Sequence, residues 1–281
     1  MNLSEYLRPS DGHVANTFQV AARRVPLTPG TPLAWGWLLG PLLLLAVWIA
    51  GSALGLIDPR VLPAPWATVR TAAHMISQGR LQSDLAVSAW RALQGLFFGV
   101  LLGVAAALFS GLTRIGDYLL DGLVQMQRGI PALALIPLII LWLGIGEAMK
   151  VAMISLVVFL QIYMHTHDAL RSIDRKHVEL AESLGLSRIA FLRHVVLPGA
   201  LPGFLLGLRI GMAQAWIALV VVEEVNATSG IGYMITLART YAETDIVLLG
   251  VVIYAVLGLS TDAAMRLLQR RLLTWRRTLA S

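Results

Sequence analysis

Apolar and polar residues alternate along this chain in long blocks. Predominantly apolar blocks cover residues 33–57, 85–112, 130–145, 148–164, 195–222 and 246–267, with polar segments between them. A helix needs roughly 20 apolar residues to cross the hydrocarbon core of a bilayer. The pattern therefore predicts an all-α, polytopic membrane protein with six transmembrane helices, of which the third is short and contains two prolines.

The second and fifth predicted spans each carry a small residue at every fourth position. In lipid, small residues at this spacing allow two helix backbones to approach closely. We therefore expect both stripes to be helix-packing surfaces, although ordinary glycine usage in membrane helices is an alternative explanation. The glycines predicted to pack are Gly95, Gly99, Gly103, Gly203, Gly207 and Gly211.

A polar segment with helical spacing, residues 174–202, lies between the fourth and fifth spans. It predicts two short amphipathic helices, 177–184 and 187–194, with Gly185 placed for a turn between them because glycine tolerates positive φ. Pro198 falls near the start of the fifth span, where a missing N–H costs least. The residues alone leave two interpretations open: a solvated loop, or a pair of helices bound by a partner protein.

The composition supports a membrane protein. Hydrophobic residues make up 57% of the chain and charged residues only 14%, against about a quarter charged in a typical soluble domain. The chain has no cysteine, which excludes disulfides, thiolate metal sites and cysteine nucleophiles. The excess of basic residues is better explained by membrane topology than by nucleic-acid binding, since cytoplasmic loops of membrane proteins are enriched in Lys and Arg.

Basic residues also predict the topology. If both ends lie in the cytoplasm, the inner segments hold fifteen Lys and Arg residues and the outer segments five, with two more inside spans. This bias places both termini and the 174–202 segment in the cytoplasm. Residues 1–32 are then a cytoplasmic tail, 33–270 a transmembrane domain with a cytoplasmic loop at 174–198, and 271–281 a basic tail.

No catalytic or metal-binding motif is recognisable. The histidines near the inner loop lack an HExxH arrangement, and we expect them to be interfacial or solvated. Residues 144–151, GIGEAMKV, lack the spacing and the hydroxyl of a phosphate-binding loop. We therefore expect no enzyme activity, no metal and no cofactor on this chain, and any ATPase that drives it would be another polypeptide.

One pattern in the polar segment resembles a known family motif. Glu179-Leu180-Ala181, three residues, Gly185, nine residues and Val195-Val196-Leu197-Pro198 are similar to the EAA motif of permeases from binding-protein-dependent ABC importers. The likeness extends over most of residues 33–275, including LLDGLVQMQRGIPALALIPLIILWLGIGEAMK at 119–150, and is greatest to aliphatic sulfonate, taurine and nitrate permeases.

The resemblance implies a type I ABC importer permease fold in a bacterial inner membrane. It also implies a homodimer, two ATPase subunits that hold ATP and magnesium, and a periplasmic or lipid-anchored substrate-binding protein. In that family the loop lies in a cleft of the ATPase, where Glu179 would pair with a basic group and Gly185 would form the bend. The residues implied to couple to the ATPase are Glu179, Ala181, Leu184, Gly185, Leu197 and Pro198.

The two arginines inside spans, Arg91 and Arg209, are candidates for the translocation pathway. A charge within a span is costly unless it is paired or faces water, and an arginine fork suits a sulfonate. Structural pairing, with a carbonyl, a nearby glutamine or a carboxylate, is the alternative for both. Gln214, one turn beyond Arg209, joins them as a pathway candidate, whereas Glu223 and Glu224 are expected to face the outer mouth.

The expected function is therefore an importer permease for aliphatic sulfonates or taurine. Nitrate or another small organic solute is an alternative within the same family. An ion-coupled secondary transporter is an alternative from another class, but it would require inverted repeats and embedded acidic residues; only Asp262 lies within a span. A membrane enzyme would need a cluster of catalytic side chains, which the sequence lacks.

Overall fold

The computed structural model describes residues 36–274, and this part of the chain is helical without any strand. Residues 49–281 form one compact unit and residues up to 48 another, so each is described by itself. The first contributes most of α1 (Gly36–Ala53), an apolar helix with Pro41 in its interior. The predicted tail at 1–32, the first residues of the predicted first span and the last residues of the basic tail lie outside the described residues.

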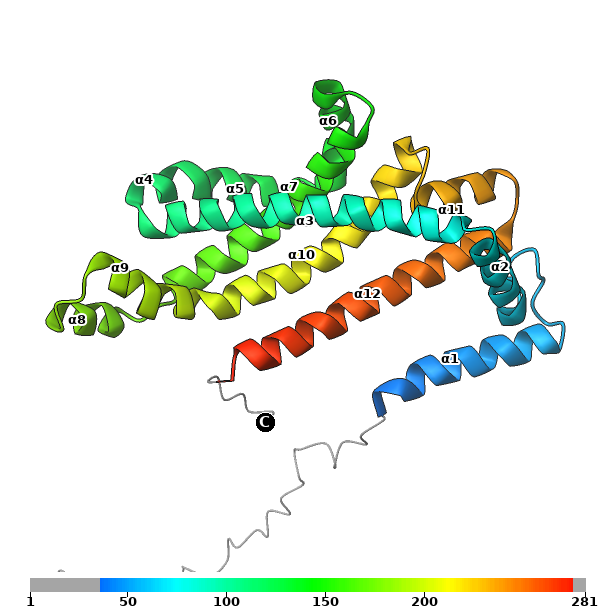
Figure 1. Cartoon of the computed structure of the whole chain (residues 1–281), viewed down its shortest axis with the longest axis horizontal. Coiled ribbons are helices and arrows are strands. Elements are labelled where there is room, and N and C mark those ends of the chain that lie inside the picture. The colour runs from blue at the N-terminus through cyan, green and yellow to red at the C-terminus, as the bar shows by residue number, and fades with distance from the viewer. Residues whose placement is uncertain (1–35, 275–281) are drawn as a thin grey trace, which may run out of the picture. The chain divides into compact units, whose positions relative to one another are not determined.

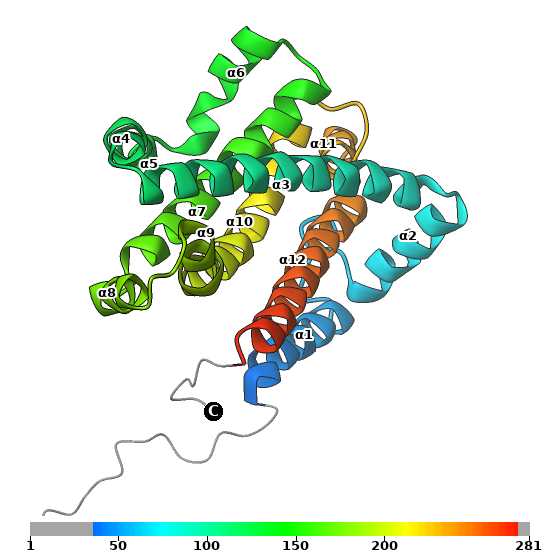
Figure 2. The same cartoon turned by 60° about the vertical axis from the view of Figure 1, so that its left-hand side comes forward.

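Long helices dominate the larger unit (Figures 1 and 2). They are α3 (Arg80–Leu112), α7 (Glu147–Arg171), α10 (Leu197–Asn226) and α12 (Thr244–Leu272). At one end of these helices lie the loop helices α8 (Arg175–Ser183) and α9 (Arg188–Phe191). At the other end lie α2 (Pro65–Ser77) and α11 (Ile231–Thr240), which pack on α12 through an apolar cluster that includes Met75, Ile231 and Leu249.

The long helices correspond to four of the six predicted spans. By length and composition, the described residues contain four helices able to cross a membrane, or five if one bent helix pair counts as a span. The apolar part of α1, Leu39–Ala53, is shorter than these. The second, fourth, fifth and sixth predicted spans thus have counterparts in the structure, and the first is represented by α1.

The predicted third span is not a single continuous helix. Residues 113–129, expected to be an inner loop with a short helix, form a nearly continuous helical run: α4 (Arg114–Gly116), the π-helical turn η2 (Asp117–Asp121) and α5 (Gly122–Arg128). A 3₁₀ turn, η3 (Ala132–Leu135), then leads into α6 (Ile136–Leu143), at a bend of 100°. Eight residues of α6 extend only about 12 Å, well short of a bilayer core of about 30 Å.

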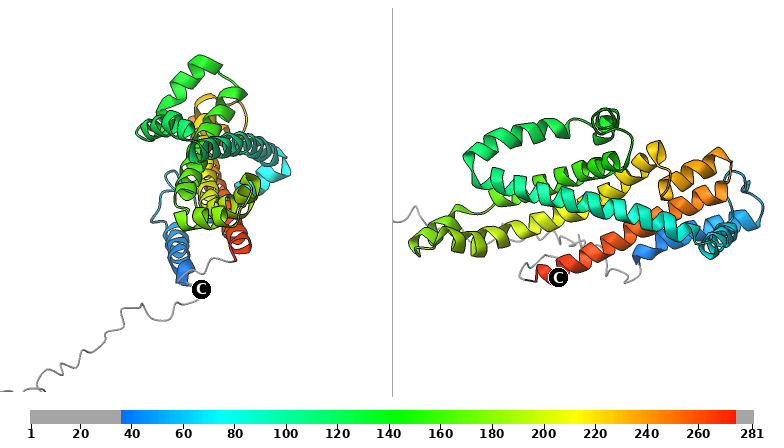
Figure 3. Two further views of the ribbon diagram at one scale, coloured as in Figure 1. Left: turned by 90° about the vertical axis from the view of Figure 1, so that its left-hand side faces the viewer. Right: turned by 45° about the horizontal axis from the view of Figure 1, so that its top comes forward.

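The α4–α5 run returns alongside α3 toward the opposite end of the unit (Figure 3, right). Its charges suggested a loop, but Asp117 and Asp121 face His167 and Arg171 of α7. Arg114 and Arg128 consequently lie at opposite ends of this helical run. The run and the segment Ala132–Leu143 meet the length and hydropathy criteria for a span only together, as one span broken at the bend or as a re-entrant loop.

The centre of the larger unit is α7, which packs between α3 and α10. Its buried residues, among them Met153, Ile154 and Val158, form the main apolar core. The small-residue stripe of α3 lies against it: a Cβ on Gly99 would come within 2.6 Å of the Val158 side chain and 2.7 Å of the Ser155 carbonyl oxygen. On the α10 side, a Cβ on Gly203 would overlap the backbone carbonyl of His165. Both stripes therefore allow backbone-to-backbone approach that a side chain would prevent.

These contacts predict that Gly99→Ala destabilises the protein much more than Gly211→Ala. The Gly99 substitution forces a methyl group against a backbone oxygen, and such overpacking costs about 1–3 kcal/mol. A Cβ on Gly211 would find its nearest neighbours at 3.6–3.8 Å, an ordinary contact, so its replacement is expected to be neutral or stabilising by up to about 1 kcal/mol. Thermal unfolding in detergent, followed by tryptophan fluorescence, measures the difference; equal midpoints would contradict the packing described.

Candidate functional site

The loop helix α8 has well-defined signals at both ends. The Asp174 side chain accepts a hydrogen bond from the backbone N–H of Lys176 (3.0 Å) and caps its first turn. At its end Gly185 adopts φ +65°. The N–H of Leu186 donates to the carbonyl of Ala181 and that of Gly185 to the carbonyl of Glu182, both at 3.0 Å, the pattern of a Schellman motif. The turn predicted at Gly185 is thus present, and its left-handed backbone is the reason glycine stands there.

The second loop helix is continuous with the span that follows it. Ser187 caps α9 by accepting from the N–H of Ala190 (3.3 Å). A π-helical turn, η4 (Leu192–Val196), then joins α9 to α10. The turn ends two residues before Pro198, which lacks an N–H donor and lies in the first turn of α10. The sequence placed a helix boundary here; instead one helical rod extends from Arg188 to Val225.

The loop exposes apolar side chains in polar surroundings. Ala181 is buried, but Leu184 and Leu197 are exposed and Ile189 is 79% exposed. Glu179 is also exposed, and its carboxylate has no ion-pair partner within the described residues. Exposed leucine and isoleucine side chains on a polar loop that also carries an exposed carboxylate are typical of a surface that a partner covers.

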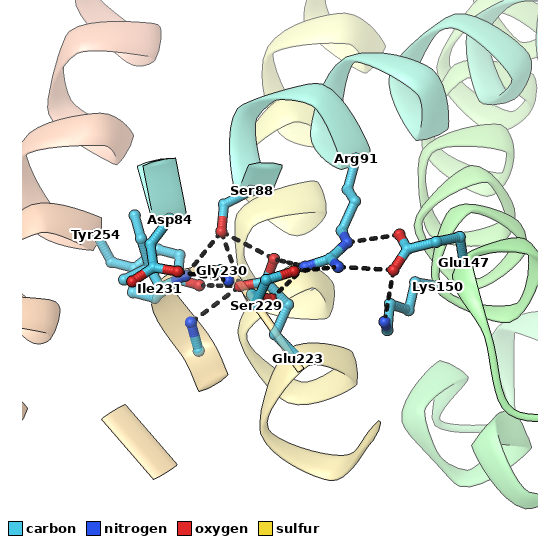
Figure 4. A network of polar contacts seen from close by, with 11 residues as sticks. Asp84, Ser88, Arg91, Glu147, Lys150, Glu223, Ser229, Gly230, Ile231 and Tyr254 are labelled. Carbon is cyan, nitrogen blue, oxygen red and sulfur yellow. Dashed lines mark hydrogen bonds and ion pairs between the residues drawn. The ribbon is translucent and has the colours of Figure 1, made fainter. Parts of the chain in front are cut away.

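A second candidate site is a buried polar network around Arg91 on α3 (Figure 4). The Arg91 side chain donates from Nε and Nη2 to the two carboxylate oxygens of Glu147 at 2.7 and 2.6 Å. Its Nη1 donates to Glu223 (2.8 Å) and to the backbone carbonyl of Ser229 (2.6 Å), and Nη2 also reaches the Ser229 hydroxyl at 3.3 Å. The five N–H donors of the guanidinium are therefore all used.

Glu223 lies at the centre of this network and is fully buried. Besides the Arg91 donor, its carboxylate accepts from the hydroxyls of Ser88 and Tyr254 and from the N–H of Gly232. The expectation that Glu223 faces the outer mouth is therefore wrong. A carboxylate is tolerated in the interior when it is paired and fully hydrogen-bonded, and here one cation and three neutral donors supply those bonds.

The network also holds the turn between α10 and α11. Gly230 has φ +108° and its N–H donates to Asp84 on α3 (3.0 Å), while the N–H of Ile231 donates to Ser88 (2.9 Å). A Cβ on Gly230 would collide with Glu223 and Arg91, so only glycine fits. Five helices, α3, α7, α10, α11 and α12, are thus tied together by one set of polar contacts.

Lys150 extends the network on α7. Its ammonium group is buried and donates to Glu147 at 2.8 Å, so Glu147 binds two cations at once while its own side chain is largely exposed. Sequence reasoning identified Arg91 but not Glu147, Lys150 or Ser88. The one available signal was the rule that a charge within a span needs a partner, which does not say which of several carboxylates supplies it.

A third cluster joins α10 to α12. Arg209 donates from Nε to Asp262 at 2.6 Å, and Asp262 also binds Arg266, one turn later on α12, at 2.7 Å. Two further contacts link these helices: Trp216 donates to Thr261 (3.3 Å) and Gln269 to the carbonyl of Leu205 (3.1 Å). Gln214 is partly exposed and makes no side-chain hydrogen bond to another described residue.

One of the loop-side histidines differs from expectation. His167 is buried, not solvated, and it lies 3.4 Å from Asp117 and 3.7 Å from Asp121 on the π-helical turn. Its ring stacks on Tyr163, whose hydroxyl donates to Ser110 of α3 (2.9 Å). Among residues 36–274 no group of three or more potential ligands is arranged to hold a metal ion.

The structure thus defines a helical membrane protein with an exposed helical loop at one end of its long helices. Residues 99–274 match the family of binding-protein-dependent transport system inner membrane components. The chain belongs to this family, whose members are multi-pass inner-membrane permeases of ABC importers.

Individual relatives cover nearly the whole chain. The putative aliphatic sulfonates transport permease protein SsuC of Escherichia coli K12 is 43% identical, over 85% of this chain and 90% of its own. The protein of the same name from Bacillus subtilis 168 is 38% identical, over 86% and 89%. The taurine transport system permease protein TauC of Escherichia coli K12 is 36% identical, over 90% and 92%.

A solved structure has the same fold. A chain from the crystal structure of an amino acid ABC transporter with histidines superposes with a TM-score of 0.60, covering 73% of this chain and 97% of that one at 18% identity. At this identity the likeness concerns the fold alone. The predicted ABC importer permease fold is confirmed.

The polar network predicts that Glu223→Ala strongly destabilises the protein. Removing this carboxylate leaves part of a buried guanidinium unpaired, and breaking such a pair costs on the order of 3 kcal/mol. Glu224→Ala is the matched control, because Glu224 is partly exposed and surface substitutions change stability by about 0.5 kcal/mol or less. The midpoint of thermal unfolding in detergent measures both; equal shifts would contradict a structural role for Glu223.

Proposed function

We propose that this chain is the permease of an ABC importer for aliphatic sulfonates or taurine. The observation that carries this proposal is the level of likeness to permeases named for those solutes, 36–43% identity over 85–90% of the chain. The ion-coupled secondary transporter is set aside, because the family works with binding proteins. Asp262, the acidic residue that the sequence places within a span, is moreover engaged by two arginines.

The working assembly in this proposal contains two copies of the chain, two ATPase subunits that bind ATP and magnesium, and a substrate-binding protein. Both termini and the loop at 174–198 face the cytoplasm, and α2 and α11 face the outer side. The support for this orientation is the distribution of basic residues, fifteen on the inner segments against five on the outer ones.

The loop is the proposed point of attachment for the ATPase. The carboxylate of Glu179 is exposed and could pair with a basic group of the partner, and the exposed Leu184 and Ile189 side chains offer apolar contact. Because α9 continues through η4 into α10 without a break, a displacement of α9 carries the adjoining span with it. Force applied in the cytoplasm would thereby reach the middle of the membrane along one rod.

Glu179→Lys is expected to release the ATPase. The substitution reverses the charge of an exposed residue without touching the folded core, so the permease itself should remain stable. Glu182→Lys is the charge-matched control, since Glu182 is an exposed residue of the same helix outside the motif. Co-purification of the ATPase in detergent is the measurement. Equal recovery with both variants would contradict the role of Glu179, as would equal loss.

The substrate class predicts a growth phenotype. A strain that lacks the gene should fail to grow with taurine or an alkanesulfonate as its sole sulfur source, and should grow normally on sulfate. Complementation with the wild-type gene should restore growth. Normal growth of the deletion strain on all of these sulfonates would remove the sulfonate assignment and leave nitrate or another small solute as the substrate.

A further inference from the structure

The two arginines within the spans, Arg91 and Arg209, differ in how many of their N–H donors have hydrogen-bond acceptors. All five donors of Arg91 are used and its side chain is buried. Arg209, in contrast, uses only Nε, in its bond to Asp262. Neither of its Nη groups has a hydrogen-bond partner among the described residues, and its side chain is 36% exposed. Of the two, Arg209 is therefore the arginine whose Nη donors are available to a ligand.

The position of Arg209 on α10 determines what those donors face. On the other side of the helix, Gly207 and Gly211 face α7, whereas Leu205, one turn before Arg209, is buried. Arg209 lies on a stripe that includes the exposed residues Leu206, Ala213 and Ile217, which recur at helical spacing. It is the charged residue of this stripe, near the middle of the rod that extends from Arg188 to Val225.

Contact with lipid is energetically unfavourable for the Arg209 side chain. Placing an arginine at the centre of a transmembrane helix costs at least about 2.5 kcal/mol, and charged groups at this depth face water-filled cavities or partners. One carboxylate on Asp262 is shared by two guanidinium groups, those of Arg209 and Arg266. The cluster therefore has one uncompensated positive charge, which a single anion would neutralise.

We infer that Arg209 is an anion-binding residue in the solute path of this permease. The path is lined by the α10 stripe of Leu206, Arg209, Ala213 and Ile217, and its ligand is the sulfonate group of a small organic monoanion. This assignment names a site for the substrate class proposed above and to that extent rests on the proposed function. The two Nη groups bind sulfonate oxygens as a fork, and the apolar residues one and two turns further along contact the alkyl part.

Asp262 is a positioning residue in this site. By accepting from Nε it fixes the plane of the guanidinium and leaves the Nη edge open. Because Asp262 also binds Arg266, it does not neutralise the cluster. Its role is separable from its charge: Asp262→Asn retains an oxygen that accepts from Nε, whereas Asp262→Ala removes both the charge and the acceptor.

The absence of cysteine from the chain permits a direct test that does not depend on transport. A cysteine introduced by Ala213→Cys lies one turn from Arg209 on the same stripe. In membrane vesicles that contain the full-length chain, it is treated with two methanethiosulfonate reagents, one bearing a sulfonate and one a trimethylammonium group. The rate ratio of the two reactions measures anion preference. Ala105→Cys, exposed on α3, is the control site.

The inference predicts that Ala213→Cys reacts with both reagents and prefers the sulfonate. Adding Arg209→Gln should lower that preference about tenfold, the lower range of electrostatic concentration of an ion in a cleft, while Arg209→Lys should retain most of it. Asp262→Asn should retain it and Asp262→Ala should lose it. The ratio at Ala105→Cys should not change with any of these substitutions.

Two results would overturn the inference. If Ala213→Cys reacts with neither reagent, the stripe is not lined by water; Ile217→Cys repeats this test should the first variant fail to fold. If the ratio is the same with Arg209 and with Arg209→Gln, Arg209 does not attract the anion. Equal effects of Asp262→Asn and Asp262→Ala would remove the positioning role. Normal growth of the deletion strain on sulfonates would by itself remove the proposed substrate, but it would not contradict an anion-binding role for Arg209.

Discussion

The arrangement of the larger unit at its α2 and α11 end depends on burying the ionised Arg91 with the carboxylates of Glu147 and Glu223. Removing charges from water is costly, and it is tolerated only where geometry and additional hydrogen bonds compensate. Here every N–H donor of the guanidinium has an acceptor: two carboxylates, a carbonyl oxygen and a hydroxyl oxygen. Since these acceptors come from three separate parts of the chain, the ends of α3, α7 and α10 cannot separate without exposing an unpaired charge.

Close helix packing supplies the complementary constraint over the rest of the spans. The glycines of α3 and α10 bring both helices against α7 at distances that side chains would forbid, which makes these three helices a rigid core. The loop helices are attached to this core by the continuous α9–α10 rod. A close-packed core joined to a continuous helix fits the proposed transmission of force from the loop to the spans. The partly open Arg209 cluster lies on that same rod.

Much of the fold could be predicted because its signals are local. Span lengths, the every-fourth-residue stripes and the turn at Gly185 depend only on neighbouring residues. The helical run at 114–128 was expected to be mostly loop because Asp117 and Asp121 look like loop residues until His167, about fifty positions away, is known to face them. The boundary expected at Pro198 was wrong for another reason. A π-helical turn, η4, joins α9 to α10 without a break, and the sequence composition gives no signal for such a turn.

The polar network was less predictable than the fold. Arg91 bonds to carboxylates 56 and 132 residues distant, and no spacing rule links such positions. Glu223 also resembled its neighbour Glu224 in sequence, although one is fully buried and the other is not. The motif at 179–198 was identifiable because its residues fall within twenty positions, but the role proposed for it involves a surface that another subunit would supply.

The central claim, that the loop helices are gripped by the ATPase, is tested most directly by cross-linking. Ile189→Cys would introduce the chain's single cysteine at one of the most exposed apolar positions of the loop, where a thiol-reactive photo-cross-linker can be attached. In the assembled transporter, illumination should join the permease to the ATPase, with a yield that changes on addition of ATP. Cross-links formed only to lipid, or equal yields with and without ATP, would contradict the account.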